Sequence, residues 1–245
     1  MEKLQRIENS VARKILGAPN YAQQAALRGE LGISSMKARL MEGQLRYLQY
    51  ILKDQENELL SRVVEEMRNS NKKNKWISGL LEYRELIGLR GEAESYLDIS
   101  RKVNEWDTRM WKQEMEEKVS LKLYREMRQS IGGQDNIYDN REAAIILFRC
   151  RTNNLDLGDR KRFVNTTTEC IMCGDPVEDL KHFILHCPAY DLERQRHPTV
   201  QRPYQENTDA ILGVLLYDNS DIENTKDILF KFWTKRQRKK RNMNN

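Results

Sequence analysis

The sequence predicts a mostly α-helical fold, and three observations support this class. First, 39% of the 245 residues are hydrophobic and 32% are charged, a balance typical of helices with one solvent-exposed face. Second, the chain holds only 5 prolines and 12 glycines, fewer turn residues than a β-sandwich of this size needs. Third, apolar residues recur at intervals of three and four along much of the chain. A chain of this length can bury a core without disulfide bonds.

The N-terminal segment predicts two helices. Residues 2–16 form an amphipathic pattern that stops at Gly17 and Pro19, because proline cannot continue a helix. A shorter helix over residues 22–31 ends at Gly32. The apolar positions of the first helix are Leu4, Ile7, Val11, Ile15 and Leu16.

Ser34 or Ser35 caps the next segment, whose apolar positions continue to Met67. This pattern predicts one long helix or two nearly collinear helices. After a polar break, a further helix covers residues 76–87 and ends at the turn that Gly88 begins.

Apolar side chains recur at steps of three and four over residues 99–110, and at strict four-residue steps from Trp111 to Met127. Because an α-helix has about 3.6 residues per turn, such steps drift around the helix by about 40° each. We therefore expect curvature or a kink near Met110 and Trp111. The periodicity favours the tryptophans and methionines of this helix as core residues over a stacking surface for bases.

The main boundary is expected at residues 131–140, where Gly132 and Gly133 begin a polar run. Beyond it, six successive apolar residues predict a helix over 143–150 that is buried on most of its surface. The expected parts are a bundle-like helical body (1–130), a connecting buried helix with a basic segment (131–164), a small module (165–195), and an amphipathic helix with a basic tail (196–245).

Positive charge is concentrated at the C-terminus. Residues 231–245 hold seven basic and no acidic side chains, and removing these seven from the 42 basic residues leaves 35 against 37 acidic ones. A field that favours phosphate is therefore expected only there. No stretch approaches the roughly 18 apolar residues of a membrane span, and the N-terminus lacks a leader pattern, so we expect a soluble, intracellular protein with no membrane partner.

Three of the four cysteines lie close together beside a histidine. Cys170 and Cys173 with Gly174 form a knuckle that brings two thiolates into one tight turn. In a reducing compartment, such a group is better explained by a metal than by disulfides. We therefore expect a Zn²⁺ ion in this part of the chain.

The residues after the knuckle predict the start of a helix that carries the third ligand. Asp175 is the expected N-cap, Pro176 the first helical residue and Glu178 the partner that completes a capping box. His182 would then lie on that helix.

Two choices remain for the fourth ligand. Pro188 keeps Cys187 out of the helix, where it can turn back toward His182. Alternatively, His186 lies four residues after His182 on the same helix face and would give a Cys2His2 site. Three thiolates and one imidazole would form a closed shell without a water ligand, which indicates a structural rather than a hydrolytic zinc site.

Three segments resemble the region that follows the polymerase domain in reverse transcriptases of non-LTR, LINE-type retrotransposons. Residues 4–33, LQRIENSVARKILGAPNYAQQAALRGELGI, are similar to the helical segment after the polymerase. Residues 141–157, REAAIILFRCRTNNLDL, are similar to the segment before the zinc motif. Residues 169–190, ECIMCGDPVEDLKHFILHCPAY, resemble the family's terminal CCHC zinc motif, and this third segment is the specific one.

The resemblance implies that the metal ligands are Cys170, Cys173, His182 and Cys187, with His186 a variable position. It also implies a role in holding template RNA and target DNA during target-primed reverse transcription. The chain contains no Asp-Asp pair, so the polymerase signature with its metal-binding carboxylates is absent. We therefore expect a protein that is not an enzyme.

Basic residues near the zinc motif and in the tail are the candidate nucleic-acid contacts, since a basic surface binds phosphate through counterion release. The tail is expected to extend beyond the last helical turn. The candidates are Arg149, Arg151, Arg160, Lys161 and Arg162 before the knuckle, and Lys235, Arg236, Arg238, Lys239, Lys240 and Arg241 in the tail.

The sequence thus predicts a non-catalytic, zinc-dependent module that binds RNA or DNA, with a nuclear location and a separate reverse transcriptase or another protein as a further partner. Two other functions remain open: a zinc-stapled helical scaffold that binds proteins, and an inert retrotransposon fragment. Salt-dependent binding to RNA or DNA distinguishes the first function from these two.

Overall fold

The computed structural model describes residues 2–53, 58–69, 75–89, 95–131, 136–138, 141–159, 168–196 and 207–244. Within these ranges the chain is helical and contains no strand, which confirms the predicted fold class. The α-helices are α1 (Glu2–Leu16), α2 (Gln24–Leu31), α3 (Met36–Lys53), α4 (Glu58–Asn69), α5 (Lys75–Leu86), α6 (Tyr96–Glu116), α7 (Lys122–Met127), α8 (Arg141–Arg151), α9 (Asp191–Arg194), α10 (Thr208–Tyr217) and α11 (Ile222–Asn244).

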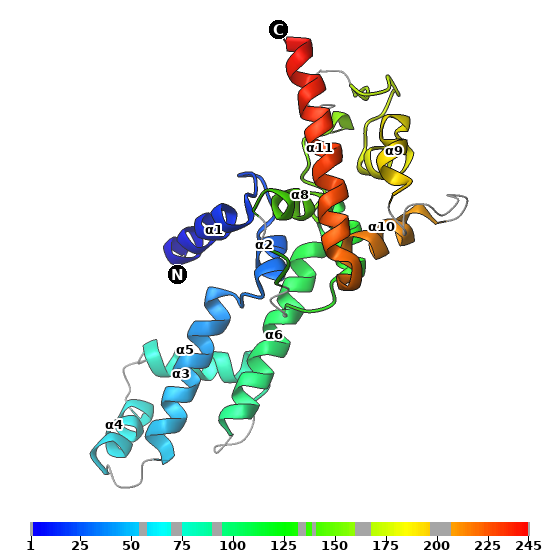
Figure 1. Ribbon diagram of the computed structural model, residues 1–245. Coiled ribbons are helices and arrows are strands. Elements are labelled where there is room, and N and C mark those ends of the chain that lie inside the picture. Colours follow the sequence, from blue (N-terminus) through cyan, green and yellow to red (C-terminus); the bar gives the residue numbers. More distant parts are fainter. Residues whose placement is uncertain are drawn as a thin grey trace.

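The helices form two lobes that α6 connects (Figure 1). One lobe contains α3, α4, α5 and the first half of α6. The other contains α1, α2, α7, α8, α10 and α11, with the segment around α9 beside the upper half of α11. The two chain ends both lie on this second lobe.

The first helix boundaries follow the sequence prediction, but the relation of α3 to α4 does not. Gly32 ends α2 in the left-handed conformation, with φ of 63°. Ser35 caps α3, since its Oγ accepts the Ala38 N–H at 3.1 Å. The prediction of one long or two collinear helices is wrong, because α4 turns back beside the end of α3 (Figure 1).

The helix α6 runs unbroken through Met110 and Trp111, so the chain is not interrupted where curvature or a kink was predicted. Trp106 packs in the core shared by α3, α5 and α6, whereas Trp111 packs in a second core with α2 and α7. Because Trp106 and Trp111 are five residues apart, they lie about 140° apart around the helix, and one continuous helix contributes to both cores. The helix ends only at Glu116, before the short turn that leads into α7.

The short helix α2 is packed closely against α6 and α7. A side chain at Gly29 would meet Tyr124 Oη at 2.3 Å and Trp111 at 2.8 Å, so only glycine fits. The Trp111 indole N–H donates to the carbonyl of Ala25 at 2.7 Å. A buried ion pair of 2.8 Å between Arg28 and Asp107 further joins α2 to α6.

The buried carboxylate of Glu30 joins α2 to α8. It receives Nη1 of Arg151 at 2.9 Å, lies 3.3 Å from Nε of Arg128, and accepts a hydrogen bond from the hydroxyl of Tyr138. Burial alone raises the pKa of this carboxyl. The charges of Arg151 and Arg128 and the hydrogen bonds outweigh that effect and bring the pKa of Glu30 below its ordinary value.

The helix α8 is buried on most of its surface, as predicted for residues 143–150. Its Phe148 lies in one core cluster with Ala12 and Leu16 of α1. Contacts therefore cross the expected boundary at 131–140, and residues 2–31 belong to the same packing unit as α8. The division into a helical body of residues 1–130 and later parts stays a prediction.

We predict that Glu30→Gln lowers the free energy of unfolding by about 3 kcal/mol at neutral pH, because it removes the counter-charge of the buried Arg151 and weakens the pairing of the half-buried Arg128. Urea unfolding at several pH values measures this. Since the folded-state pKa is lowered, the loss relative to the wild type should shrink as the pH falls below about 4.5. The exposed Glu82→Gln is the control and should change little. A loss independent of pH would contradict the assignment to charge.

Candidate metal centre

Four side chains from three short segments meet at one point. The ligand atoms of Cys170, Cys173, His182 and Cys187 all lie within 4.8 Å of one another. The sulfur of Cys173 is 3.3 Å from Nε2 of His182, and the sulfurs of Cys170 and Cys187 are 3.8 Å apart. These four donors suit one metal ion in tetrahedral coordination. The structure thus brings together the four predicted ligands as a metal site.

The first two ligands lie on a tight knuckle. The N–H of Gly174 donates to the carbonyl of Cys170 at 2.8 Å, and Gly174 has a φ of 81°, which glycine adopts without strain. The N–H of Cys170 in turn donates to the carbonyl of Asp175 at 2.8 Å. The backbone therefore holds the sulfurs of Cys170 and Cys173 on the same side of the turn, as the sequence predicted.

The helix that carries His182 begins later than the capping box predicted. Asp175 Oδ1 accepts the N–H of Val177 at 3.1 Å and stabilises a turn, not a helix. The helical segment starts at Leu180, and Asp179 caps it by accepting the His182 N–H at 2.7 Å. The predicted helix start at Asp175, Pro176 and Glu178 is therefore wrong. Glu178 does not complete a capping box, because its carboxylate binds the side chain of Arg236.

A π-helical turn spans His182–His186 and decides the fourth ligand. The N–H of Cys187 donates to the carbonyl of His182, five residues earlier, at 2.7 Å. This wider turn places residues 182 and 187 on the same side, so Cys187 joins the cluster. His186 is exposed and is not part of it. The Cys2His2 alternative rested on α-helical spacing, which this turn does not have.

Glu178 is the residue of this site that the sequence reasoning missed. Its side chain is fully buried and forms two hydrogen bonds with Arg236 of α11, at 2.7 and 2.6 Å. It also accepts the N–H of Gly158 at 2.9 Å, and its Oε1 lies 3.7 Å from the sulfur of Cys170. Glu178 therefore joins the metal ligands to α11 and to the loop after α8.

The sequence did hold a signal for this pair. Arg236 lies four residues after Phe232 and therefore on the apolar face of α11. A charged residue on a buried face requires a partner of opposite charge. The metal motif offers Asp175, Glu178 and Asp179 as partners, and only the structure selects Glu178.

An aromatic cluster packs beneath the ligands. Phe183 contacts Tyr190 and Phe232 edge to face, with ring centroids 5.4 and 5.9 Å apart. Tyr190 stacks on Phe232 at 4.5 Å. Residues 168–190, the metal-centre segment, therefore share one hydrophobic core with α11.

One thiol of the site is favoured in its thiolate form. A hydrogen bond from Cys187 lowers the pKa of Cys170 to about 5, whereas the same bond raises the pKa of Cys187 and burial raises the pKa of Cys173. A bound metal would replace the protons of the other two thiols. By contrast, burial raises the pKa of Cys150, which lies fully inside α8 and outside the cluster.

Two of the predicted nucleic-acid contacts lie in the interior. Arg151 is 1% exposed and bonds to Glu30 and to the carbonyl of Leu216, and Arg236 is bound to Glu178. Each guanidinium is held by a buried carboxylate and cannot contact phosphate in this structure. These two predictions are corrected accordingly.

The other candidates divide into three groups. Arg149 donates to the carbonyl of Gly17 at 2.7 Å, Lys235 pairs with Glu193 at 2.8 Å, and Lys240 pairs with Asp156 at 3.1 Å. Arg160, Lys161 and Arg162 lie outside the described residues. The exposed candidates are Arg238, Lys239 and Arg241.

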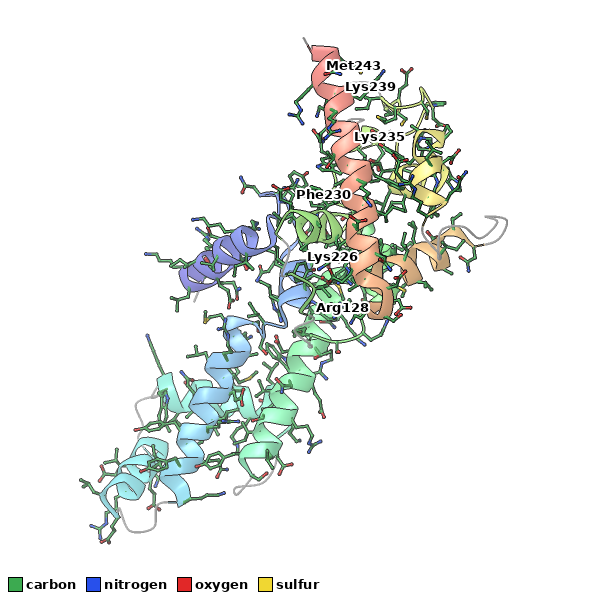
Figure 2. All side chains as sticks on the ribbon, in the orientation of Figure 1. Arg128, Lys226, Phe230, Lys235, Lys239 and Met243 are labelled. Carbon is green, nitrogen blue, oxygen red and sulfur yellow. The ribbon has the colours of Figure 1, made fainter. Side chains whose placement is uncertain are left out.

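The basic residues do not form a tail beyond a helix. The helix α11 continues to Asn244, and Figure 2 shows its side chains from Lys226 to Met243 along one continuous ribbon. Arg236 and Lys240, at four-residue spacing, face acidic partners below the helix. These contacts and the high helix propensity of Lys and Arg extend the helix through the basic run.

Comparison with known proteins finds no matching family model, no similar curated protein and no similar solved structure. Among the described helices, none has the length and apolar character that crossing a bilayer requires.

We predict that the purified, tag-free chain binds one metal ion, and that Cys170→Ser, His182→Ala or Cys187→Ser each removes it, because a tetrahedral site needs all four donors. Elemental analysis after extensive dialysis measures the ratio of metal to protein. His186→Ala and Cys150→Ala are the matched controls and should retain the metal. Retention by His182→Ala together with loss by His186→Ala would overturn the ligand assignment.

Proposed function

We propose that the chain is a non-catalytic, zinc-dependent module that binds RNA or DNA, equivalent to the C-terminal region of a LINE-type reverse transcriptase. The donor set supports Zn²⁺, since three thiolates and one imidazole are ligands of structural zinc sites. Such a shell leaves no position for a reactive water, so the ion would stabilise the fold and perform no chemistry. The missing Asp-Asp pair agrees with a module that depends on a separate polymerase.

One observation carries the proposal: α11 has one face on the metal centre and a second face with unburied cations. Phe232 and Arg236 pack into the metal-centre segment, while Arg238, Lys239 and Arg241 are exposed. The segment around α9 lies beside the same part of α11 (Figure 2). Arg238 and Arg241, three residues apart, lie on the side of α11 opposite Arg236, and Lys239 lies on its flank, so a helix that the metal centre holds in place offers cations to phosphate groups.

The exposed Arg196, two residues after the end of α9, adds a fourth cation on the metal-centre side, and its charge also acts on Glu193. Lys231 is paired with Asp227 and contributes less free charge. The proposed interface is therefore smaller than the run of seven basic residues suggested. An interface of this size matches a contact with a few consecutive phosphates. We also propose a nuclear location for the protein.

We predict that replacing Arg238, Lys239 and Arg241 together by Gln weakens binding to single-stranded RNA. For single strands, each phosphate contact contributes about 0.7 to the slope of log affinity against log salt, so the slope should fall by about 2. Fluorescence anisotropy with a labelled oligonucleotide, repeated at several salt concentrations, measures both quantities. Circular dichroism would verify that the triple variant keeps its helical content.

A second triple variant serves as the charge-matched control. Lys53, Lys75 and Arg109 are exposed and lie on α3, α5 and α6, so their replacement by Gln removes the same charge from other surfaces. This variant should keep most of the wild-type affinity. Equal losses in the two variants would show a non-specific charge effect, and no binding by the wild type at low salt would contradict the proposed function.

A further inference from the structure

The helix α1 presents its apolar face to solvent. Leu4, Ile7, Val11 and Ile15 are 55%, 61%, 50% and 55% exposed, and together they form the α1 stripe. Their spacing of three and four residues places them in one line along the helix. A contiguous apolar line of this kind on a folded protein marks an interaction surface.

The orientation of α1 is fixed by its opposite side. Ala12 and Leu16 pack against Phe148 of α8, and Gln5 accepts the N–H of Met36 at 3.2 Å. Glu8 forms an ion pair with Arg39 of α3. These contacts hold the helix with the smaller and more polar side inward. The α1 stripe is therefore displayed by the fold and does not contribute to its core.

The stripe ends at a pocket. A cavity of about 280 Å³ lies between α1 and α8, lined by Lys14, Ile15 and Leu16 and by Tyr138, Ala144 and Ile145. The volume is sufficient for one large apolar side chain. Surfaces with an exposed apolar line next to a pocket bind amphipathic helices, which insert one large apolar side chain into the pocket.

The charges beside the stripe identify the partner's chemistry. Lys3 and Lys14 are exposed and separated by eleven residues, which places them on the same side of the helix, within about 20° of each other. The only acid on the other side of the stripe, Glu8, is already paired with Arg39. The flank beside the stripe is therefore positive and fits acidic residues on a partner.

We propose that the α1 stripe and its pocket bind an amphipathic helix of a partner protein that carries acidic residues beside its apolar face. This surface is separate from the cations of α11, so the proposal goes beyond the proposed function. The partner helix would lie along α1, place one large apolar side chain between α1 and α8, and set its acidic residues opposite Lys3 and Lys14.

Two other occupants fit the surface less well. A second copy that paired α1 with α1 in antiparallel fashion would bring the lysine flanks face to face, since equal flanks meet in such a pair. A lipid surface binds broad apolar faces with aromatic residues and offers nothing for a socket. The α1 stripe is narrow, lacks aromatic residues and ends in a pocket.

The test uses the full chain and a synthetic helical peptide with leucines at intervals of three and four and glutamates beside them. Fluorescence anisotropy should show saturable binding. The double variant Ile7→Ser with Val11→Ser should bind at least about tenfold more weakly, because it removes apolar area at the centre of the stripe. The controls Leu97→Ser and Leu192→Ser, 81% and 70% exposed elsewhere, should not change the affinity.

Charge provides the second arm. A peptide with lysines in place of the glutamates should bind the wild type more weakly, and Lys3→Glu with Lys14→Glu should reverse this preference. The proposal is overturned if the acidic peptide does not bind or if the stripe variant binds it equally well. Dimerisation, or sedimentation with anionic vesicles, that Ile7→Ser with Val11→Ser abolishes would also overturn it in favour of a second copy or a lipid surface.

Discussion

The buried ion pair between Glu178 and Arg236 is the interaction on which the arrangement of the metal centre depends. Both side chains are fully removed from solvent, so either charge alone would destabilise the protein by about 3–5 kcal/mol. The carboxylate also touches the sulfur of Cys170 and the N–H of Gly158. One acidic side chain therefore holds together the knuckle, the loop after α8 and the helix α11. Because α11 packs on α8 as well, the metal centre is tied to the helical body.

A second buried pair, Glu30 with Arg151, performs the same task at α8, where it joins the N-terminal helices to the rest of the lobe. In both pairs, an arginine that the sequence suggested as a surface cation lies in the protein interior. These two arginines are therefore not part of the surface that can bind a ligand. The cations left for a ligand are those of α11 that point away from the metal centre, and their position depends on the pair that fixes the helix.

The sequence predicted what depends on local chemistry. Helix boundaries at Gly32 and Gly88 and the grouping of three cysteines with His182 follow from turn residues and ligand spacing, and the structure agrees. It could not predict what depends on contacts between distant segments. The π-helical turn changes which residue faces His182, and α1 turns its stronger apolar face outward because α8 accepts the smaller Ala12 side. The resemblance to LINE-type reverse transcriptases stays a prediction.

The most direct test of this account is hydrogen exchange with and without a metal chelator, followed by mass spectrometry of peptides from the full chain. Metal binding contributes to folding where ligands come from separate segments. If the ion, Glu178 and Arg236 hold α11 in place, chelation should remove amide protection from residues 168–190 and from the second half of α11 together. Protection of α3 and of α6 should remain. Loss of protection at the knuckle alone, with α11 unchanged, would contradict the account.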